Sequence, residues 1–167
     1  MEVIDRLYCG GNETYSRVAG KPGWSWLRCC KENGPDCHRQ VLGYTTLGAP
    51  AGPNYLAVQK GHLLSLNMID VDDMKMYPDE LIDDGLEFVN KRYLAGDKVL
   101  IACNSGMHRG PTMCLAYLRT IGEMPYASFK YAEHVFKTLY PKYDSGGGIR
   151  LKIRSRWVDL KDKFLKG

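Results

Sequence analysis

The sequence predicts an α/β fold with a central, mostly parallel sheet flanked by helices. Strand-like and helix-like segments alternate through its second half, which is typical of parallel sheets with helical connections. The run from Lys98 to Ala102 is short and almost continuously apolar, as in strands that are buried on both faces. A length of 167 residues, 44% hydrophobic and 25% charged, favours a single globular domain over residues 1–167.

The first half of the chain gives weaker signals than the second. Residues Val3 to Cys9 are predicted to form a strand that is closed by Gly10-Gly11-Asn12. Glycine- and proline-rich turns follow between Lys21 and Gly52, around short segments such as Trp24 to Cys30.

A strand is next predicted from the alternation of Leu64, Leu66 and Met68. It runs into three acidic residues, as a strand does when it ends at a polar rim. We expect the strand to end at the first of these, and the three are Asp70, Asp72 and Asp73.

Helical spacing begins after Pro78 and ends near Gly96, with apolar residues at Ile82, Leu86, Val89 and Tyr93. The buried strand Lys98 to Ala102 follows. Pro111 then indicates the first turn of another helix, because the N–H groups of a first turn have no partner within the helix and the missing N–H of proline costs nothing there. Two further amphipathic helices are predicted from the sets Phe129, Ala132, Phe136, Leu139 and Ile153, Trp157, Leu160, Phe164.

Charge and hydropathy exclude several classes of partner. The net charge of +4 comes from 23 basic and 19 acidic side chains, an excess too small to indicate nucleic acid. No apolar run approaches the roughly 20 residues of a membrane span, and the N-terminus lacks the pattern of a signal peptide. We therefore expect a cytoplasmic protein that binds neither membranes nor nucleic acid.

The cysteines are expected to be free thiols in a reducing compartment, mostly buried. Zinc is an alternative for Cys29, Cys30, Cys37 and His38, because three thiols and an imidazole are a known ligand set. The adjacent pair spoils the usual two-plus-two spacing, so we expect no metal and no cofactor.

The segment from Cys103 to Arg109 carries the chemistry. A cysteine follows a buried strand directly, and an arginine stands six positions later at the mouth of a helix. Helix N-terminal and loop N–H groups bind phosphate oxygens, and the same field favours a thiolate. The arginine can hold two oxygens with its planar fork. The predicted phosphate-binding residues are Asn104, Ser105, Gly106, Met107, His108 and Arg109.

This loop resembles the Cys-x5-Arg signature of cysteine-dependent protein phosphatases, and its surroundings resemble the compact dual-specificity branch. The resemblance extends from the strand at Asp70 to Tyr117-Leu118. Residues 66–70, 29–44 and 140–143 are also similar to small bacterial and phage members. The resemblance implies the protein tyrosine phosphatase fold.

The resemblance further implies a two-step reaction without a metal. Cys103 attacks phosphorus to form a cysteinyl-phosphate, and an aspartic acid protonates the leaving oxygen and then activates water. In the family this acid lies about thirty residues before the cysteine, so Asp70, Asp72 and Asp73 all qualify. Asp70 is preferred because the strand alternation ends there.

Two positions depart from the family pattern. Ala102 stands where histidine normally orders the loop and favours the thiolate, and Gly110 stands where a serine or threonine normally donates to the leaving sulfur. Each lost donor costs about 1.5 to 3 kcal/mol, or roughly one to two powers of ten in rate. The sequence therefore predicts a slow enzyme.

Several functions remain open at this stage. We expect hydrolysis of phosphate from protein tyrosine, with serine and threonine as further substrates, and phosphate or sulfate binding in the loop. A weakly active or inactive phosphate-binding module is the alternative. Lipid head groups and RNA 5′ ends are disfavoured by the few basic residues in the loop.

Overall fold

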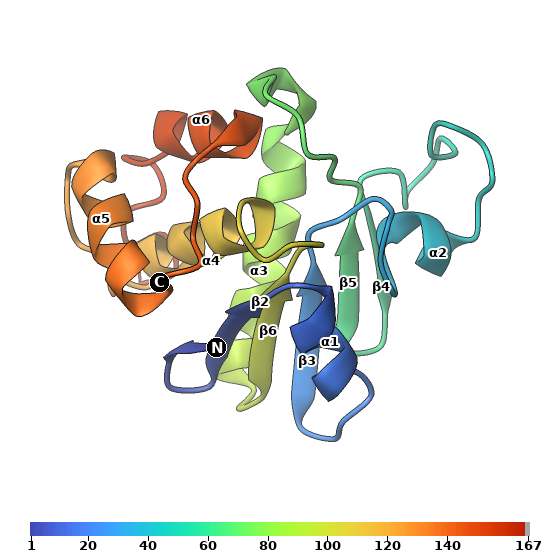
Figure 1. Ribbon diagram of the computed structural model, residues 1–167, viewed down its shortest axis with the longest axis horizontal. Helices are drawn as coiled ribbons and strands as arrows, with labels where there is room; N and C mark the ends of the chain where they lie inside the picture. The colour runs from blue at the N-terminus through green and yellow to red at the C-terminus, as the bar shows by residue number, and fades with distance from the viewer. Residues whose placement is uncertain (166–167) are drawn as a thin grey trace.

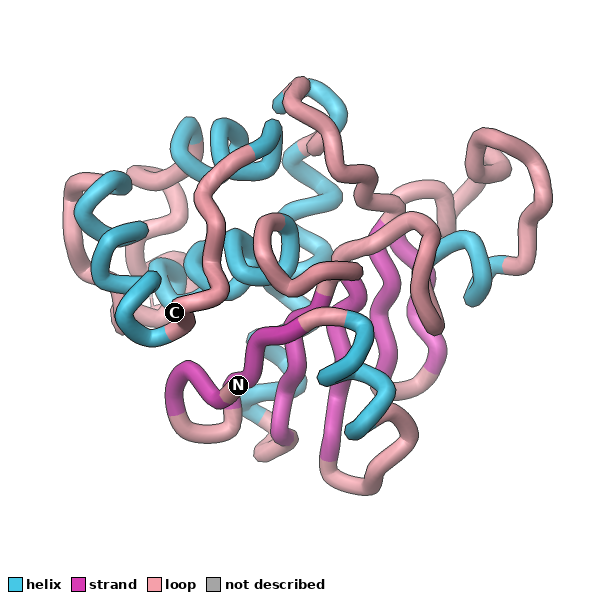
Figure 2. Tube along the Cα trace, in the orientation of Figure 1, coloured by secondary structure: helices cyan, strands magenta, loops and turns pink. Residues whose placement is uncertain are grey.

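The computed structural model describes residues 1–165, which build one mixed six-stranded sheet with helices on both faces (Figures 1 and 2). The strands stand in the order β1-β2-β6-β3-β5-β4. The four inner strands are parallel, and each edge strand is antiparallel to its neighbour. The strands are β1 (Glu2–Ile4), β2 (Leu7–Gly10), β3 (Trp24–Arg28), β4 (Ala57–Lys60), β5 (Leu63–Leu66) and β6 (Lys98–Ala102). The predicted α/β class with a mostly parallel sheet is confirmed.

Helices cover the sheet unequally. The smaller ones, α1 and α2, lie apart from α3, α4, α5 and α6, as Figure 1 shows. The helices are α1 (Asn12–Val18), α2 (His38–Leu42), the 3-10 turn η1 (Met74–Met76), α3 (Asp79–Leu94), α4 (Arg109–Thr120), α5 (Phe129–Leu139) and α6 (Gly147–Ser155).

The central strand β6 divides its side chains between two cores. Val99 and Ile101 belong to the large core that α3 and α4 cover. Leu100 and Ala102 belong to the small core beneath α1. This is the two-residue period of a strand that is buried on both faces. It explains why the sequence of β6 reads as a continuous apolar run.

Several predicted elements are found where the sequence places them. The helix after Pro78 is α3, the strand Lys98 to Ala102 is β6, and the helix that begins at Phe129 is α5. The helix that contains Pro111 begins at Arg109, so the proline lies in its first turn as expected.

Three predicted boundaries are wrong. The first strand is split into β1 and β2 by a tight turn in which Arg6 has a φ of 61°. The strand predicted to reach Asp70 ends at Leu66, because Met68 turns away from the ladder and its carbonyl accepts from Lys31 N–H at 2.9 Å. The third concerns the last helix.

The last helix is α6, which begins at Gly147 and ends at Ser155 instead of running from Ile153 to Phe164. The apolar spacing is real, because Trp157 and Leu160 are buried in the large core. The chain beyond Ser155 forms tight turns, because the N–H of Phe164 donates to the C=O of Thr120 at the end of α4, at 3.1 Å, and not to a carbonyl four residues earlier. Tertiary hydrogen bonds therefore replace helical ones.

Candidate active site

The predicted phosphate-binding loop joins β6 to α4 at the carboxyl ends of the parallel strands. Cys103 follows β6 directly and is only 1% exposed. The N–H of Gly106 donates to Cys103 Sγ at 3.3 Å, so the loop wraps around the sulfur. Within residues 1–165 the N–H groups of Ser105 and His108 have no acceptor. The loop therefore offers free donors beside the thiol.

Close packing against the start of α1 fixes the shape of this loop. Gly106 has a φ of +73°, and a Cβ there would lie 2.7 Å from backbone atoms of Gly10 and Gly11. Asn12 N–H donates to Asn104 C=O at 2.9 Å. The turn after β2, which the sequence identified only as the end of a strand, is thus a support for the loop.

Arg109 is the first residue of α4, and its side chain is buried. Its Nη1 donates to Met68 C=O at 2.8 Å, and its Nη2 donates to Asn104 Oδ1 at 2.7 Å. Its Nε is buried and has no hydrogen-bond partner among the described residues. Two of the five guanidinium N–H groups are therefore occupied, and the other three can donate to the oxygens of an anion.

A segment after α5 covers the outer side of the loop. Tyr140 O–H donates to Gly106 C=O at 2.7 Å, and Asp144 N–H donates to Met107 C=O at 3.0 Å. His108 Nδ1 lies 2.7 Å from Asp144 C=O, to which it donates. The imidazole of His108 therefore points toward the segment that follows α5.

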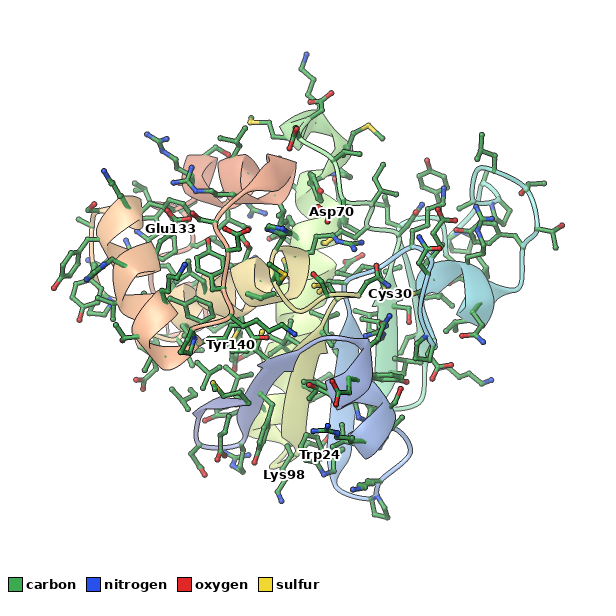
Figure 3. The ribbon with its side chains drawn as sticks, in the orientation of Figure 1. Trp24, Cys30, Asp70, Lys98, Glu133 and Tyr140 are labelled. Atoms are coloured by element: carbon green, nitrogen blue, oxygen red, sulfur yellow. A yellow bond between two sulfur atoms is a disulfide. The ribbon has the colours of Figure 1, made fainter. Side chains whose placement is uncertain are left out.

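The three candidate acids occupy different surroundings. Asp73 Oδ1 accepts from Lys75 N–H at 2.9 Å and so caps η1. Asp72 lines a cavity of about 280 Å³ with Arg150. Asp70, labelled in Figure 3, is exposed. Its Oδ1 comes within 3.7 Å of the Cβ position at Gly147.

A glycine run links Asp70 to the phosphate loop. The Cβ position at Gly146 lies 3.7 Å from His108 Nδ1, and the next residue, Gly147, borders Asp70. Gly148 N–H donates to Val71 C=O at 2.7 Å. A Cβ at Gly148 would lie 2.7 Å from the backbone carbon of Asp73, so the lack of a side chain at this position lets the segment approach the acidic residues closely, a role that no pattern in the sequence indicated.

Other cysteines surround Cys103 in the interior. Burial raises the pKa of the Cys29 thiol, and burial together with a hydrogen bond from the Cys9 thiol to Cys114 raises that of Cys9. Both therefore remain protonated thiols at neutral pH. Cys114 is buried inside α4, as expected for a core residue.

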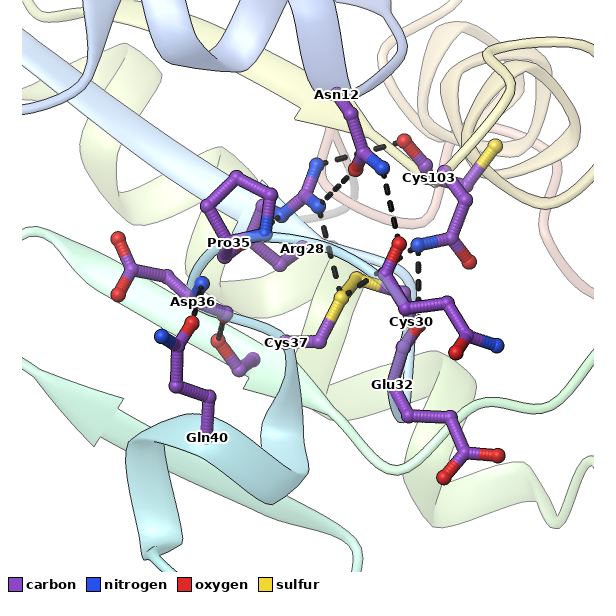
Figure 4. Close-up of a disulfide and its surroundings, with 12 residues drawn as sticks. Asn12, Arg28, Cys30, Glu32, Pro35, Asp36, Cys37, Gln40 and Cys103 are labelled. Atoms are coloured by element: carbon purple, nitrogen blue, oxygen red, sulfur yellow. Dashed lines mark hydrogen bonds between the residues drawn. A yellow bond between two sulfur atoms is a disulfide. The ribbon is translucent and has the colours of Figure 1, made fainter.

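The expectation that all cysteines are free thiols is wrong. Cys30 and Cys37 form a disulfide, with their Cα atoms 5.2 Å apart. The turn between them contains Asn33 and Asp36 with positive φ, which bends the chain back on itself. Figure 4 shows that this disulfide lies beside the phosphate loop. Asn104 Nδ2 donates to Cys37 Sγ at 3.7 Å and to Glu32 C=O at 3.0 Å.

The disulfide also removes the zinc alternative, because two of its four ligands are oxidised. The fourth, His38, bonds to Asn54 C=O at 2.8 Å through Nε2 and to Tyr44 Oη at 3.2 Å through Nδ1. No group of three or more metal-ligating side chains occurs in residues 1–165. Over the same residues, no helix has the length and apolar character to cross a membrane.

Comparison with known proteins identifies the fold. No family model and no curated protein sequence matches the chain. The crystal structure of DUSP15 matches 94% of this chain and 86% of its own, with a TM-score of 0.62 and 15% identity. A leucine rich repeat and phosphatase domain containing protein from Entamoeba histolytica matches 100% and 94%, with a TM-score of 0.62 and 15% identity.

A third match is the human tyrosine phosphatase-like serine/threonine/tyrosine-interacting protein. It covers 95% of both chains with a TM-score of 0.61 and 15% identity. These likenesses confirm the predicted protein tyrosine phosphatase-like fold.

Proposed function

We propose that this protein is a cysteine-dependent phosphatase that hydrolyses phosphomonoesters through a cysteinyl-phosphate intermediate. One observation supports the proposal: the loop at the carboxyl end of β6 turns the N–H of Gly106 onto the sulfur of Cys103, and the helix that follows begins at Arg109, whose guanidinium bonds to Asn104 in the same loop. Such a site stabilises both a thiolate and the charge of a phosphoryl group in transfer.

Each residue has a role in the proposed reaction. Cys103 Sγ attacks phosphorus and the ester oxygen leaves with a proton from Asp70. The resulting carboxylate then removes a proton from the water that releases phosphate from sulfur. Arg109 holds two phosphoryl oxygens throughout. Asp70 is favoured over Asp73, whose carboxylate already caps η1.

The proposed substrate is a phosphoprotein, with phosphotyrosine preferred and phosphoserine or phosphothreonine also accepted. The proposed location is the cytoplasm, and the proposed unit is a single catalytic domain over residues 1–167. The oxidised Cys30–Cys37 pair gives no support to a reducing compartment. Cell fractionation, with thiols blocked before lysis, tests the location and the oxidation state together.

Hydrolysis of a small aryl phosphate tests the reaction. We expect Cys103→Ser to abolish turnover and Asp70→Asn to lower kcat by about 100-fold or more. Asp72→Asn and Asp73→Asn are matched controls that should retain most of the rate. If the wild type is no faster than Cys103→Ser but still binds vanadate, the protein is a phosphate-binding module instead.

The second step is proposed to limit turnover, because Gly110 offers no hydroxyl to the departing sulfur. Rapid-quench experiments should then show phosphate covalently bound to Cys103 during steady state. Turnover without an accumulated intermediate would place the slow step before it.

A further inference from the structure

Arg28 is a second buried arginine beside the phosphate loop. It is the last residue of β3 and is 0% exposed. No carboxylate within residues 1–165 forms a salt bridge with it, whereas Arg92 and Arg150 each pair with one. A buried charge without a partner is costly to maintain, so its position calls for an explanation.

All of its hydrogen-bond acceptors are neutral, and they lie around the loop (Figure 4). Nη2 donates to Asn12 Oδ1 at 2.6 Å, and Nε donates to Pro35 C=O at 3.1 Å. Nη1 is 3.4 Å from the carbonyl oxygen of Cys103. The guanidinium also stacks on the ring of Tyr15, 4.5 Å from its centroid. Its positive charge is therefore not cancelled by any of these groups.

Strand register places Arg28 beside Ala102, the residue that precedes the nucleophile. Arg28 pairs with Ala102 in the parallel ladder between β3 and β6. Trp26, two residues before Arg28, and Ala102 both belong to the small core, so the two paired side chains point to the same face. The small side chain of Ala102 leaves this face to the guanidinium.

The surrounding ionisable groups leave that charge in place. Burial raises the pKa of Cys9, Tyr15, Cys29 and Tyr140, so these groups stay neutral at neutral pH. Burial lowers the pKa of Arg28 from its usual value, but an arginine remains charged at neutral pH. The nearby anion is Asp36, whose carboxylate accepts a 2.5 Å hydrogen bond from Tyr15. Cys103 acts electrostatically on Arg28 and on the buried Cys9, Cys29 and Tyr140, and Arg109 and Cys114 act on the adjacent Cys29.

We propose that Arg28 is a positioning residue for Cys103: its unpaired charge stabilises the thiolate, and its donors fix the carbonyl of Cys103 and the start of α1. The inference rests on the proposed function, because it gives this charge a use only where Cys103 acts as a thiolate. In this proposal Arg28, on the neighbouring strand β3, supplies the electrostatic stabilisation of the thiolate that the side chain of Ala102 cannot supply.

Alkylation of Cys103 by iodoacetamide tests the charge separately from turnover. The rate is followed from pH 4 to 9 by mass spectrometry of the peptide that contains Cys103, with Cys103→Ser as the blank. We expect Arg28→Met to slow alkylation at pH 6 by about tenfold and to move the midpoint of the pH profile upward. Arg28→Lys keeps the charge and should recover most of that rate, although both variants lower Tm.

A second pair of variants keeps the arginine and so guards against misfolding. Asn12→Asp places a carboxylate against Nη2 and should reproduce the loss, whereas Asn12→Ala should keep the wild-type midpoint. If all four variants keep the wild-type midpoint and only Tm falls, Arg28 is a structural residue and the inference is wrong. If the midpoint shifts as expected but neither the wild type nor any variant hydrolyses an aryl phosphate, the proposed function is wrong and the inference about Arg28 and the thiolate stands.

Discussion

Opening the Cys30–Cys37 disulfide should destabilise the protein by an amount that its loop length sets. The two cysteines are separated by 7 positions. Closing a loop of this size removes chain entropy from the unfolded state that corresponds to about 2.4 kcal/mol at 25 °C. With a urea slope of about 2 kcal/mol per molar, the unfolding midpoint should fall by about 1.2 M.

The disulfide should also affect the phosphate loop. Cys37 Sγ accepts from both Arg28 and Asn104, and Asn104 Oδ1 in turn accepts from Arg109. Release of the turn gives Asn104 and Arg109 more freedom. We therefore expect reduction to raise KM for an aryl phosphate more than it lowers kcat, because Arg109 contributes to binding before the chemical step.

Urea titrations of the wild type with and without a phosphine reductant measure the effect, and mass spectrometry after thiol blocking confirms that the bond is open. The variant Cys30→Ala/Cys37→Ala is the control, since its midpoint should not respond to reductant. A fully reduced wild type whose midpoint stays within about 0.2 M of the oxidised value would refute the loop-closure argument.

Three further predictions follow from single contacts. Gly106→Ala must adopt a positive φ against Gly10 and should lose vanadate binding in titrations, with a stability cost above the 1–2 kcal/mol typical of a left-handed residue; tight binding would contradict it. Tyr140→Phe leaves Gly106 C=O without its donor and should lower stability by about 1 kcal/mol in urea; an unchanged midpoint would show that this bond is replaced. For Asp97, burial acts to raise the pKa, but hydrogen bonds from Ser25 and Arg92 outweigh it and lower the pKa. The resulting stability is present above the unfolded pKa of about 3.9 and is lost as pH falls through the lower folded value. The Tm gap between Asp97→Asn and wild type should thus be large at pH 7 and small at pH 3, and an equal gap would exclude this linkage.

The parts of the fold that the sequence predicts are those with strong local signals. The apolar run of β6 and the helical spacing of α3 each fix an element without reference to the rest of the chain. The phosphate loop follows from them, since Cys103 and Arg109 are placed by the end of the strand and the start of the helix. The residue types of the loop then suffice to predict its chemistry.

The parts that were missed depend on contacts between distant segments. Nothing local shows that Cys30 and Cys37 meet, because the positive φ at Asn33 and Asp36 that closes the turn is set by the folded chain. The residues after Leu66 have the sequence pattern of a strand, but the carbonyl of Met68 accepts a hydrogen bond from Lys31 N–H and so does not join the sheet. Arg28, in a strand of aromatic residues, gave no sign that it would be buried beside the thiol.

Gly110 changes its meaning once the structure is known. In the family that the loop resembles, a serine or threonine stands at this position, which suggests that Gly110→Ser would restore the hydroxyl and speed release of phosphate from sulfur. In the structure, however, a Cβ at this position would lie 2.9 Å from Cys103 N and 3.2 Å from Ala102 C, both backbone atoms. The start of α4 therefore lies closer to the end of β6 than a residue with a Cβ at position 110 would allow.

A serine at position 110 must push α4 away from Cys103, and Arg109 moves with the helix. We therefore expect Gly110→Ser to lower both Tm and kcat, and Gly110→Ala, which adds the same Cβ without a hydroxyl, to lower both equally. Thermal unfolding and rapid-quench measurement of the two steps compare the variants. A serine variant that releases phosphate faster than wild type, beside a slower alanine variant, would show that the loop accommodates the Cβ and that the missing hydroxyl alone limits the second step.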